Sequence, residues 1–103
     1  MSSRNAGTFR KTPTESQPLG FDFVDDLDVG ETISSATFSV VVVDGADPDV
    51  GDMLTGSSAI SGSEVRQRVR NGVAGVTYEV RAVVVTSASN TKQSCAYLVV
   101  EAC

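Results

Sequence analysis

The 103-residue sequence contains no histidine and no tryptophan. Without histidine there is no imidazole to act as general base, which excludes nucleophilic catalysis by a Ser-His or Cys-His pair. The clustered acidic residues lie in turn-rich segments, with no sign of the apolar pocket that would raise the pKa of a catalytic carboxyl group. We therefore expect no enzyme activity, no catalytic residues and no cofactor.

Long hydrophobic runs are also missing. The longest, Val40 to Val43, ends at Asp44, whereas a membrane-spanning helix needs about 18 to 20 apolar residues. The N-terminus carries charge without an apolar segment behind it, unlike a secretory signal. We expect no membrane association and synthesis in the cytoplasm without export.

The residues that are abundant are strand formers. Valine is frequent and leucine scarce, and serine, threonine and glycine occupy the intervals, a composition typical of short strands joined by tight turns. Six or seven apolar stretches recur about every ten residues, which predicts an all-β, immunoglobulin-like (fibronectin III-like) β-sandwich. The clearest stretches are 19–23, 32–43, 58–61, 63–70, 77–86 and 93–102, with a bend expected near Ser34 and Ser35.

Residues 1–18 differ from the rest. They are polar, contain Pro13 and Pro18, and show neither helical nor strand periodicity. We expect an extended N-terminal arm over 1–18 that orders against a partner, followed by the sandwich over 19–103.

Asn71 and Gly72 form the strongest turn signal, because both residue types tolerate a positive φ. Gly75 follows, and Tyr78 opens the next strand. Immunoglobulin-like sandwiches place a tyrosine at such a corner, with its ring in the core and its hydroxyl bonded to nearby backbone. The alternative is an ordinary core-facing aromatic residue. Either interpretation makes Gly72, Gly75 and Tyr78 structural.

Charge is distributed in three blocks. Residues 1–21 carry a net charge of +2, residues 22–52 carry −9 with no basic residue, and residues 53–103 carry +2, which together give −5. Opposite patches of this kind suit association between copies of the chain. The alternative is an acidic, solvated loop region.

Two segments supply the candidate subunit interface. One is an acidic loop and the other a strand with arginine at every second position, which places the guanidinium groups on one face. A calcium site in the loop is a second interpretation, but the spacing does not follow the known calcium-loop pattern. Nucleic-acid binding by the arginines is disfavoured because the chain is acidic and no aromatic residues alternate with them. The interface residues are Asp44, Asp47, Asp49, Asp52, Arg66, Arg68 and Arg70.

The two cysteines, Cys95 and Cys103, are eight positions apart. On one continuous strand they would be separated by about 26 Å, too far for a disulfide unless the tail folds back. Free thiols and an interchain disulfide both remain open, with Cys103 the more accessible candidate crosslinker and Cys95 suited to a core position.

Three motifs resemble small structural proteins of tailed bacteriophages. F21-D-F-V leads to D28-V-G-E-T-I-S-S-A-T, and G72-V-A-G-V-T-Y78 leads to a strand that ends in Thr-Ser. Residues 19–100 follow this pattern, whereas the two cysteines do not belong to it. The resemblance implies a non-enzymatic virion subunit, present in many copies at the head-to-tail neck (collar) or as a capsid decoration. Its partners would be copies of itself and capsid, portal or tail proteins. The alternative is a monomeric sandwich that binds carbohydrate or a host surface.

Overall fold

A computed structural model describes residues 4–102, with side chains from Gly7 onward. The chain forms seven strands and two short 3-10 turns in an elongated body of 43 × 27 × 20 Å. No helix in this part of the chain is long and apolar enough to cross a membrane. The elements are β1 (Arg4–Lys11), β2 (Gln17–Asp22), η1 (Val24–Asp26), β3 (Ile33–Asp44), η2 (Val50–Met53), β4 (Leu54–Ser61), β5 (Glu64–Val69), β6 (Thr77–Thr86) and β7 (Thr91–Val100).

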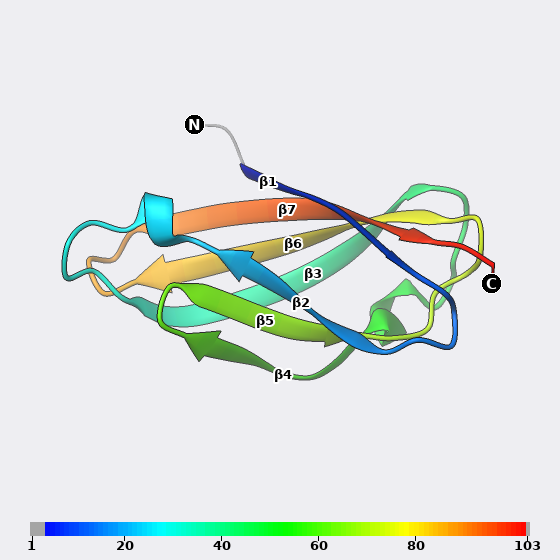
Figure 1. The fold of residues 1–103 in the computed structure, drawn as a ribbon, viewed down its shortest axis with the longest axis horizontal. Coiled ribbons are helices and arrows are strands. Elements are labelled where there is room, and N and C mark those ends of the chain that lie inside the picture. Colours follow the sequence, from blue (N-terminus) through cyan, green and yellow to red (C-terminus); the bar gives the residue numbers. More distant parts are fainter. Residues whose placement is uncertain (1–3, 103) are drawn as a thin grey trace.

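The strands form two sheets that pack face to face. One has the order β1-β7-β6-β3 and the other β2-β5-β4. β1 runs parallel to β7, and the other neighbours are antiparallel. The predicted immunoglobulin-like sandwich is therefore confirmed. The connections gather at the two ends of the long axis, with η2, the β1–β2 turn and the β5–β6 crossover at the end where the C-terminus lies (Figure 1).

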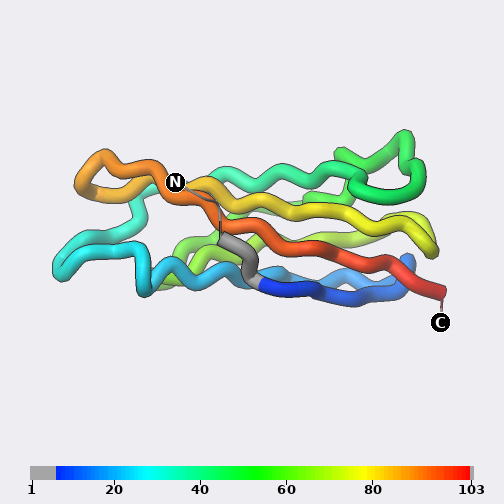
Figure 2. Tube along the Cα trace, turned by 90° about the horizontal axis from the view of Figure 1, so that it is seen from above, coloured from blue at the N-terminus to red at the C-terminus, as the bar shows by residue number. Residues whose placement is uncertain are grey.

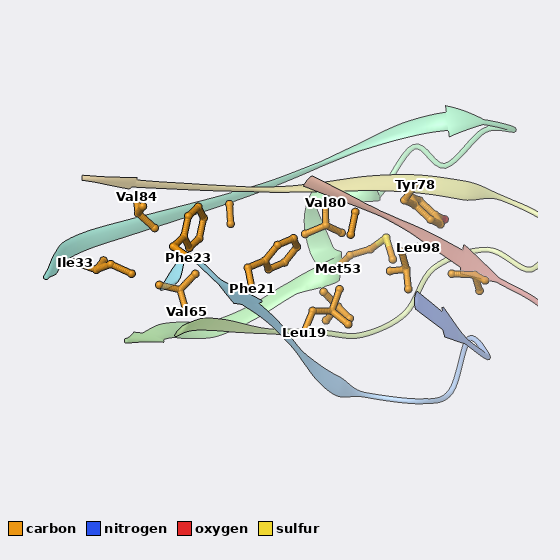
Figure 3. Close-up of a cluster of buried hydrophobic side chains, with 14 of the residues drawn as sticks. Leu19, Phe21, Phe23, Ile33, Met53, Val65, Tyr78, Val80, Val84 and Leu98 are labelled. Atoms are coloured by element: carbon orange, nitrogen blue, oxygen red, sulfur yellow. The ribbon is translucent and has the colours of Figure 1, made fainter. Parts of the chain in front are cut away.

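Alternation of buried and outward residues, strict in β5 and β6, produces much of the core. In β6 every second residue from Tyr78 to Thr86 is buried, because successive side chains point to opposite faces of a sheet. β2 contributes Leu19 and Phe21, and Phe23 follows it. Figure 3 shows these side chains between the two sheets, with Met53 entering from η2. Phe21 contacts the rings of Phe9 and Phe38, at centroid distances of 6.3 Å and 5.7 Å.

The stretch that the sequence assigns to the arm contains two strands. Residues 4–11 form β1 and pair with β7 of the same chain, with a register shift between Asn5 and Thr8. β2 already begins at Gln17. β1 could not be predicted from the sequence, because residues 4–11 have no period-2 apolar pattern and pair with a strand more than eighty residues away.

One local expectation is confirmed. The register of β3 shifts between Ile33 and Ser35, where a bend was expected. β7 pairs with β6 along its length. β4 begins at Leu54, four residues before the predicted stretch, and its pairing with β5 is irregular between Thr55 and Ala59.

Candidate binding surfaces at the acidic end and on the arginine face

Tyr78 joins three segments at the acidic end of the sandwich. Its ring is fully buried, and its hydroxyl accepts a hydrogen bond from the backbone N–H of Val73 (2.8 Å) and donates one to Asp47 Oδ2 (2.8 Å). The bond to Val73 has the geometry of a tyrosine corner. Burial raises the pKa of the Tyr78 hydroxyl, and the nearby Asp47 carboxylate raises it further, while the Val73 N–H acts in the opposite direction.

Asp47, Asp49 and Asp52 face the loop Asn71–Val73 across an open cleft of about 230 Å³. Asp47 has a structural task, because it also accepts a hydrogen bond from the backbone N–H of Asp49 (2.9 Å). Asp44, the fourth predicted acid, ends β3 and does not line this cleft. In the described residues no group of acidic or cysteine side chains is arranged to hold a metal ion.

Asn71 and Gly72, which line the cleft, and Gly75 nearby in the sequence have unusual backbone conformations. All three have a positive φ, of 58°, 98° and 87°. A Cβ at Gly72 would lie 2.8 Å from Val100 Cγ2 and 3.1 Å from Met53 Cε, whereas nothing lies within 4 Å of one at Gly75. Gly72 therefore meets a conformational and a steric requirement, and Gly75 only the first.

The predicted arginine row lies on the outer face of β5, where Arg66 and Arg68 alternate with buried residues. Arg66 forms an ion pair with Glu64 of the same strand (2.8 Å), and Arg68 donates to Ser16 O (3.2 Å). Arg70, just after the strand, donates through Nε to the backbone carbonyl of Asp52 (3.0 Å). A guanidinium group has five N–H donors, so each arginine retains donors for a further partner.

The acidic cleft and the arginine row meet at Arg70 and Asp52. Beyond that point they diverge, because the cleft occupies the end of the sandwich and Arg66 and Arg68 extend along the face of the three-stranded sheet. One chain therefore presents an acidic end and a basic face in different directions.

Lys11 was not singled out from the sequence, although it has a central position at this end. It is 2% exposed, and its Nζ donates to the carbonyls of Thr12 (2.6 Å) and Asn71. Burial lowers the pKa of the Lys11 ammonium group, and Glu15 partly offsets this. Lys11 ties the end of β1 to the Asn71 turn. A lysine in a polar segment gives no sequence signal for such burial.

Two other polar side chains hold irregular backbone. Gln67 Nε2 donates to the carbonyls of Thr55 (2.9 Å) and Gly56 (3.2 Å), where the β4–β5 pairing is interrupted. At the opposite end of the sandwich, Glu31 accepts hydrogen bonds from the Thr86 hydroxyl, from the Asp28 N–H (2.9 Å) and from Asn90 Nδ2 (3.0 Å). These bonds, that from Thr86 above all, lower the pKa of the Glu31 carboxyl group.

Cys95 lies on β7, opposite Arg81 of β6 and Asn5 of β1. It is 9% exposed, and its neighbours Ser94 and Ala96 are buried as well. Cys95 therefore has a buried position, as expected, although it lies outside the main hydrophobic cluster. Cys103 is outside the described residues.

Comparison with known proteins gives one family. The family described as "Podophage GP4 fiber-tail adaptor protein gp77" matches residues 11–99. The match runs from the end of β1 almost to the end of β7 and so includes both sheets. No curated protein matches the chain.

Proposed function

This chain belongs to the family of the podophage GP4 fiber-tail adaptor protein gp77, which makes it a structural component of a phage virion, and from that premise we propose that it attaches a fibre to the tail. The observation that carries the proposal is the match over residues 11–99, which covers nearly the whole sandwich. Such an adaptor contacts the tail through one surface and the fibre through another. The proposal places the chain on the tail side of the particle, in preference to the capsid surface.

The distribution of charge supports a role between two partners. The end of the sandwich that carries Asp47, Asp49 and Asp52 is acidic, and the outer face of β5 presents Arg66 and Arg68. A basic partner can dock on the acidic end and an acidic partner on the arginine face. One small domain can therefore connect two structures.

Deleting the gene from the phage that encodes it tests the placement. We expect particles with filled heads and intact tails that lack fibres in electron micrographs, and that regain them when the protein is supplied in trans. Heads without tails would instead indicate a neck protein. Particles that keep their fibres but have less stable capsids would indicate a decoration protein, and either result would overturn the proposal.

Contact between copies is a second part of the proposal. The acidic end of one copy would meet the arginine face of the next, which is a head-to-tail contact and leads to rings when the rotation closes. Asp49 and Arg68 suit a charge-reversal test, because Asp49 is exposed and the Arg68 guanidinium donates to Ser16, an uncharged residue.

Native mass spectrometry should show loss of oligomers for Asp49→Lys and for Arg68→Glu, with recovery in the double variant. Arg81→Glu is the control, because Arg81 lies on the other sheet, paired with Glu79 (2.7 Å). Unchanged oligomers in both single variants would contradict this contact while leaving the adaptor role in place.

The aromatic residues do not favour the carbohydrate-binding alternative. A sugar-binding face needs exposed rings, but Phe21, Phe23 and Tyr78 are fully buried, and Phe9 and Phe38 pack against the core. Among the described aromatic residues, Tyr97 is the most exposed, at 37%.

A further inference from the structure

The four edge strands of the sandwich are not protected equally. β1 has a register shift between Asn5 and Thr8, and β2 has Pro18 within it. The pairing of β4 is interrupted between Thr55 and Ala59, around a Gly56 whose φ is +74°. Bulges, proline and irregular strands are the devices by which natural sheets prevent a further strand from adding to an edge.

β3 has none of these devices along its centre. It is the longest strand, with twelve residues, and its register against β6 is unbroken from Ser35 to Val42. Ser34 to Val43 includes no charge, proline or glycine. Figure 2 shows β3 (teal) at the side of the sheet opposite β1 (dark blue), with β6 and β7 between them. Its outer edge is therefore suited to accept another strand.

The charges around β3 indicate the chemistry of the strand that its edge would accept. Glu31 precedes β3, Asp44 ends it, and Asp47 and Asp49 follow in the next loop. The segment 22–52, which contains β3, has nine acidic residues and no basic one. A strand from another β3 would bring acidic ends together in either direction and would be repelled.

We infer that the edge of β3 binds an extended segment of a partner protein, uncharged at its centre and with lysine or arginine at both ends. This inference rests on the proposed function, since it specifies one docking site of the adaptor. The arm of a second copy is disfavoured as occupant although it is basic. Residues 9–11 are held in their own chain by the Phe9 contact with Phe21 and the bonds of Lys11 to Thr12 and Asn71.

The first experiment uses the purified full-length chain and two synthetic peptides. In both, threonine and valine alternate; one has lysine at each end and the other glutamate. We expect the lysine peptide to bind about tenfold more tightly at low salt, to lose this advantage at high salt, and to protect the amides of residues 35–42 from hydrogen exchange. Equal affinities, or protection confined to another strand, would overturn the inference. So would a dimer, formed without peptide, in which the β3 amides are protected.

Two pairs of variants localise the effect. Asp44→Asn should weaken binding of the lysine peptide several-fold, whereas the same change at Asp25, an acid on η1 that is also exposed, should not. Val41→Lys places a charge on the edge strand, and Val85→Lys places the same charge on the interior strand β6. Both valines are on the outer face and 39% exposed. Binding should fall for Val41→Lys only, and equal losses in the two would contradict the inference.

Phage particles separate this inference from the proposed function. Particles with Val41→Lys should lose fibres and particles with Val85→Lys should keep them. If a gene deletion removes fibres but Val41→Lys does not, the adaptor role stands and the β3 site is wrong. If the deletion itself leaves fibres in place, the adaptor role is wrong, whatever the peptides do.

Discussion

The two edges of the four-stranded sheet differ in how many contacts join them to the rest of the chain. At one edge, β1 is joined to the body by the Phe9–Phe21 contact, by the buried Lys11 and by the Arg10–Glu101 ion pair (3.1 Å). Even the outward-facing carbonyl of Arg10 accepts a hydrogen bond, from Gln17 Nε2 (3.2 Å). At the other edge, β3 is longer, uncharged along its centre and bonded to a strand on one side.

The difference indicates that one edge of the sheet serves stability and the other serves recognition. The β1 edge is closed by contacts inside the chain, so perturbing it should affect folding. The β3 edge contributes its backbone to one neighbour only, so perturbing its outer residues should affect binding and leave folding nearly intact. The predictions below concern the closed edge, the end that supports it and, last, the opposite end, and most of them compare a variant with a matched change elsewhere.

Deleting residues 2–11 should have the largest effect. It removes β1, withdraws Phe9 from the core and exposes the edge of β7, so we expect the free energy of unfolding to fall by at least ~3 kcal/mol. Val41→Ser at the β3 edge should cost less than ~1 kcal/mol. Urea denaturation of both variants measures the comparison. A truncated protein as stable as wild type would show that β1 is dispensable for folding.

Gly72→Ala should destabilise the protein by about 2–3 kcal/mol, because the new methyl group requires a strained φ and meets Val100 and Met53. Gly75→Ala is the control, with a positive φ and open space, and should cost about 1 kcal/mol. The difference between the two thermal midpoints isolates the steric contribution. Equal shifts would mean that the Val100 and Met53 side chains move aside freely.

Tyr78→Phe should cost about 1–2 kcal/mol. The ring stays in the core, but the Val73 N–H loses its acceptor and Asp47 loses its donor. Wild type should also lose stability as the pH rises through 10 and above, because the raised pKa of Tyr78 keeps its proton in the folded state after the unfolded chain has released it. Chemical denaturation at neutral and alkaline pH tests both statements. An alkaline slope that persists unchanged in Tyr78→Phe would assign it to another group.

Lys11→Met and Arg10→Met compare the loss of a buried cation with the loss of an exposed one. Lys11→Met leaves the Asn71 and Thr12 carbonyls without their donor and should cost about 1–2 kcal/mol. Arg10→Met removes an ion pair whose side chains are 66% and 50% exposed, and should cost no more than ~0.5 kcal/mol. The same urea titration compares the two neighbouring positions. If Arg10→Met proved the more harmful, the closure of the β1 edge would depend on its surface pair.

The smallest expected effect lies at the far end of the sandwich. The hydrogen bonds to Glu31 lower its pKa from the ordinary 4.5, so the folded state favours the carboxylate. The stability that this supplies is complete well above 4.5 and is lost as the pH falls through the folded-state pKa. Between about pH 5 and 3 the thermal midpoint of wild type should fall slightly more steeply than that of Glu31→Gln. Parallel curves would mean that these bonds do not favour the charged form.

The sequence predicted the sandwich and most of its strands, because alternation of apolar and polar residues is a local property. β5, β6 and β7 lie close to their expected ranges. The Asn71–Gly72 turn has the predicted positive φ values. These features follow from residue type and spacing alone.

The candidate surfaces were predictable in part. The alternation of arginine along β5 placed Arg66 and Arg68 on one exposed face. The acids of the loop look alike in the sequence, and Asp47, Asp49 and Asp52 all line the cleft, yet Asp47 also bonds to Tyr78. Nothing local distinguishes them, because the partner of Asp47 is 31 residues away.

The order of residue types by itself determined that this protein is a two-layered β structure with an acidic segment and an arginine strand, since side-chain direction along a strand repeats every two residues. Only the tertiary structure decided that Lys11 is buried, that β1 closes one edge and that β3 remains open at the other. Those outcomes depend on which distant strands become neighbours. Strands pair through backbone N–H and C=O groups, which nearly every residue carries whatever its side chain. The order of side chains therefore does not specify which strands pair.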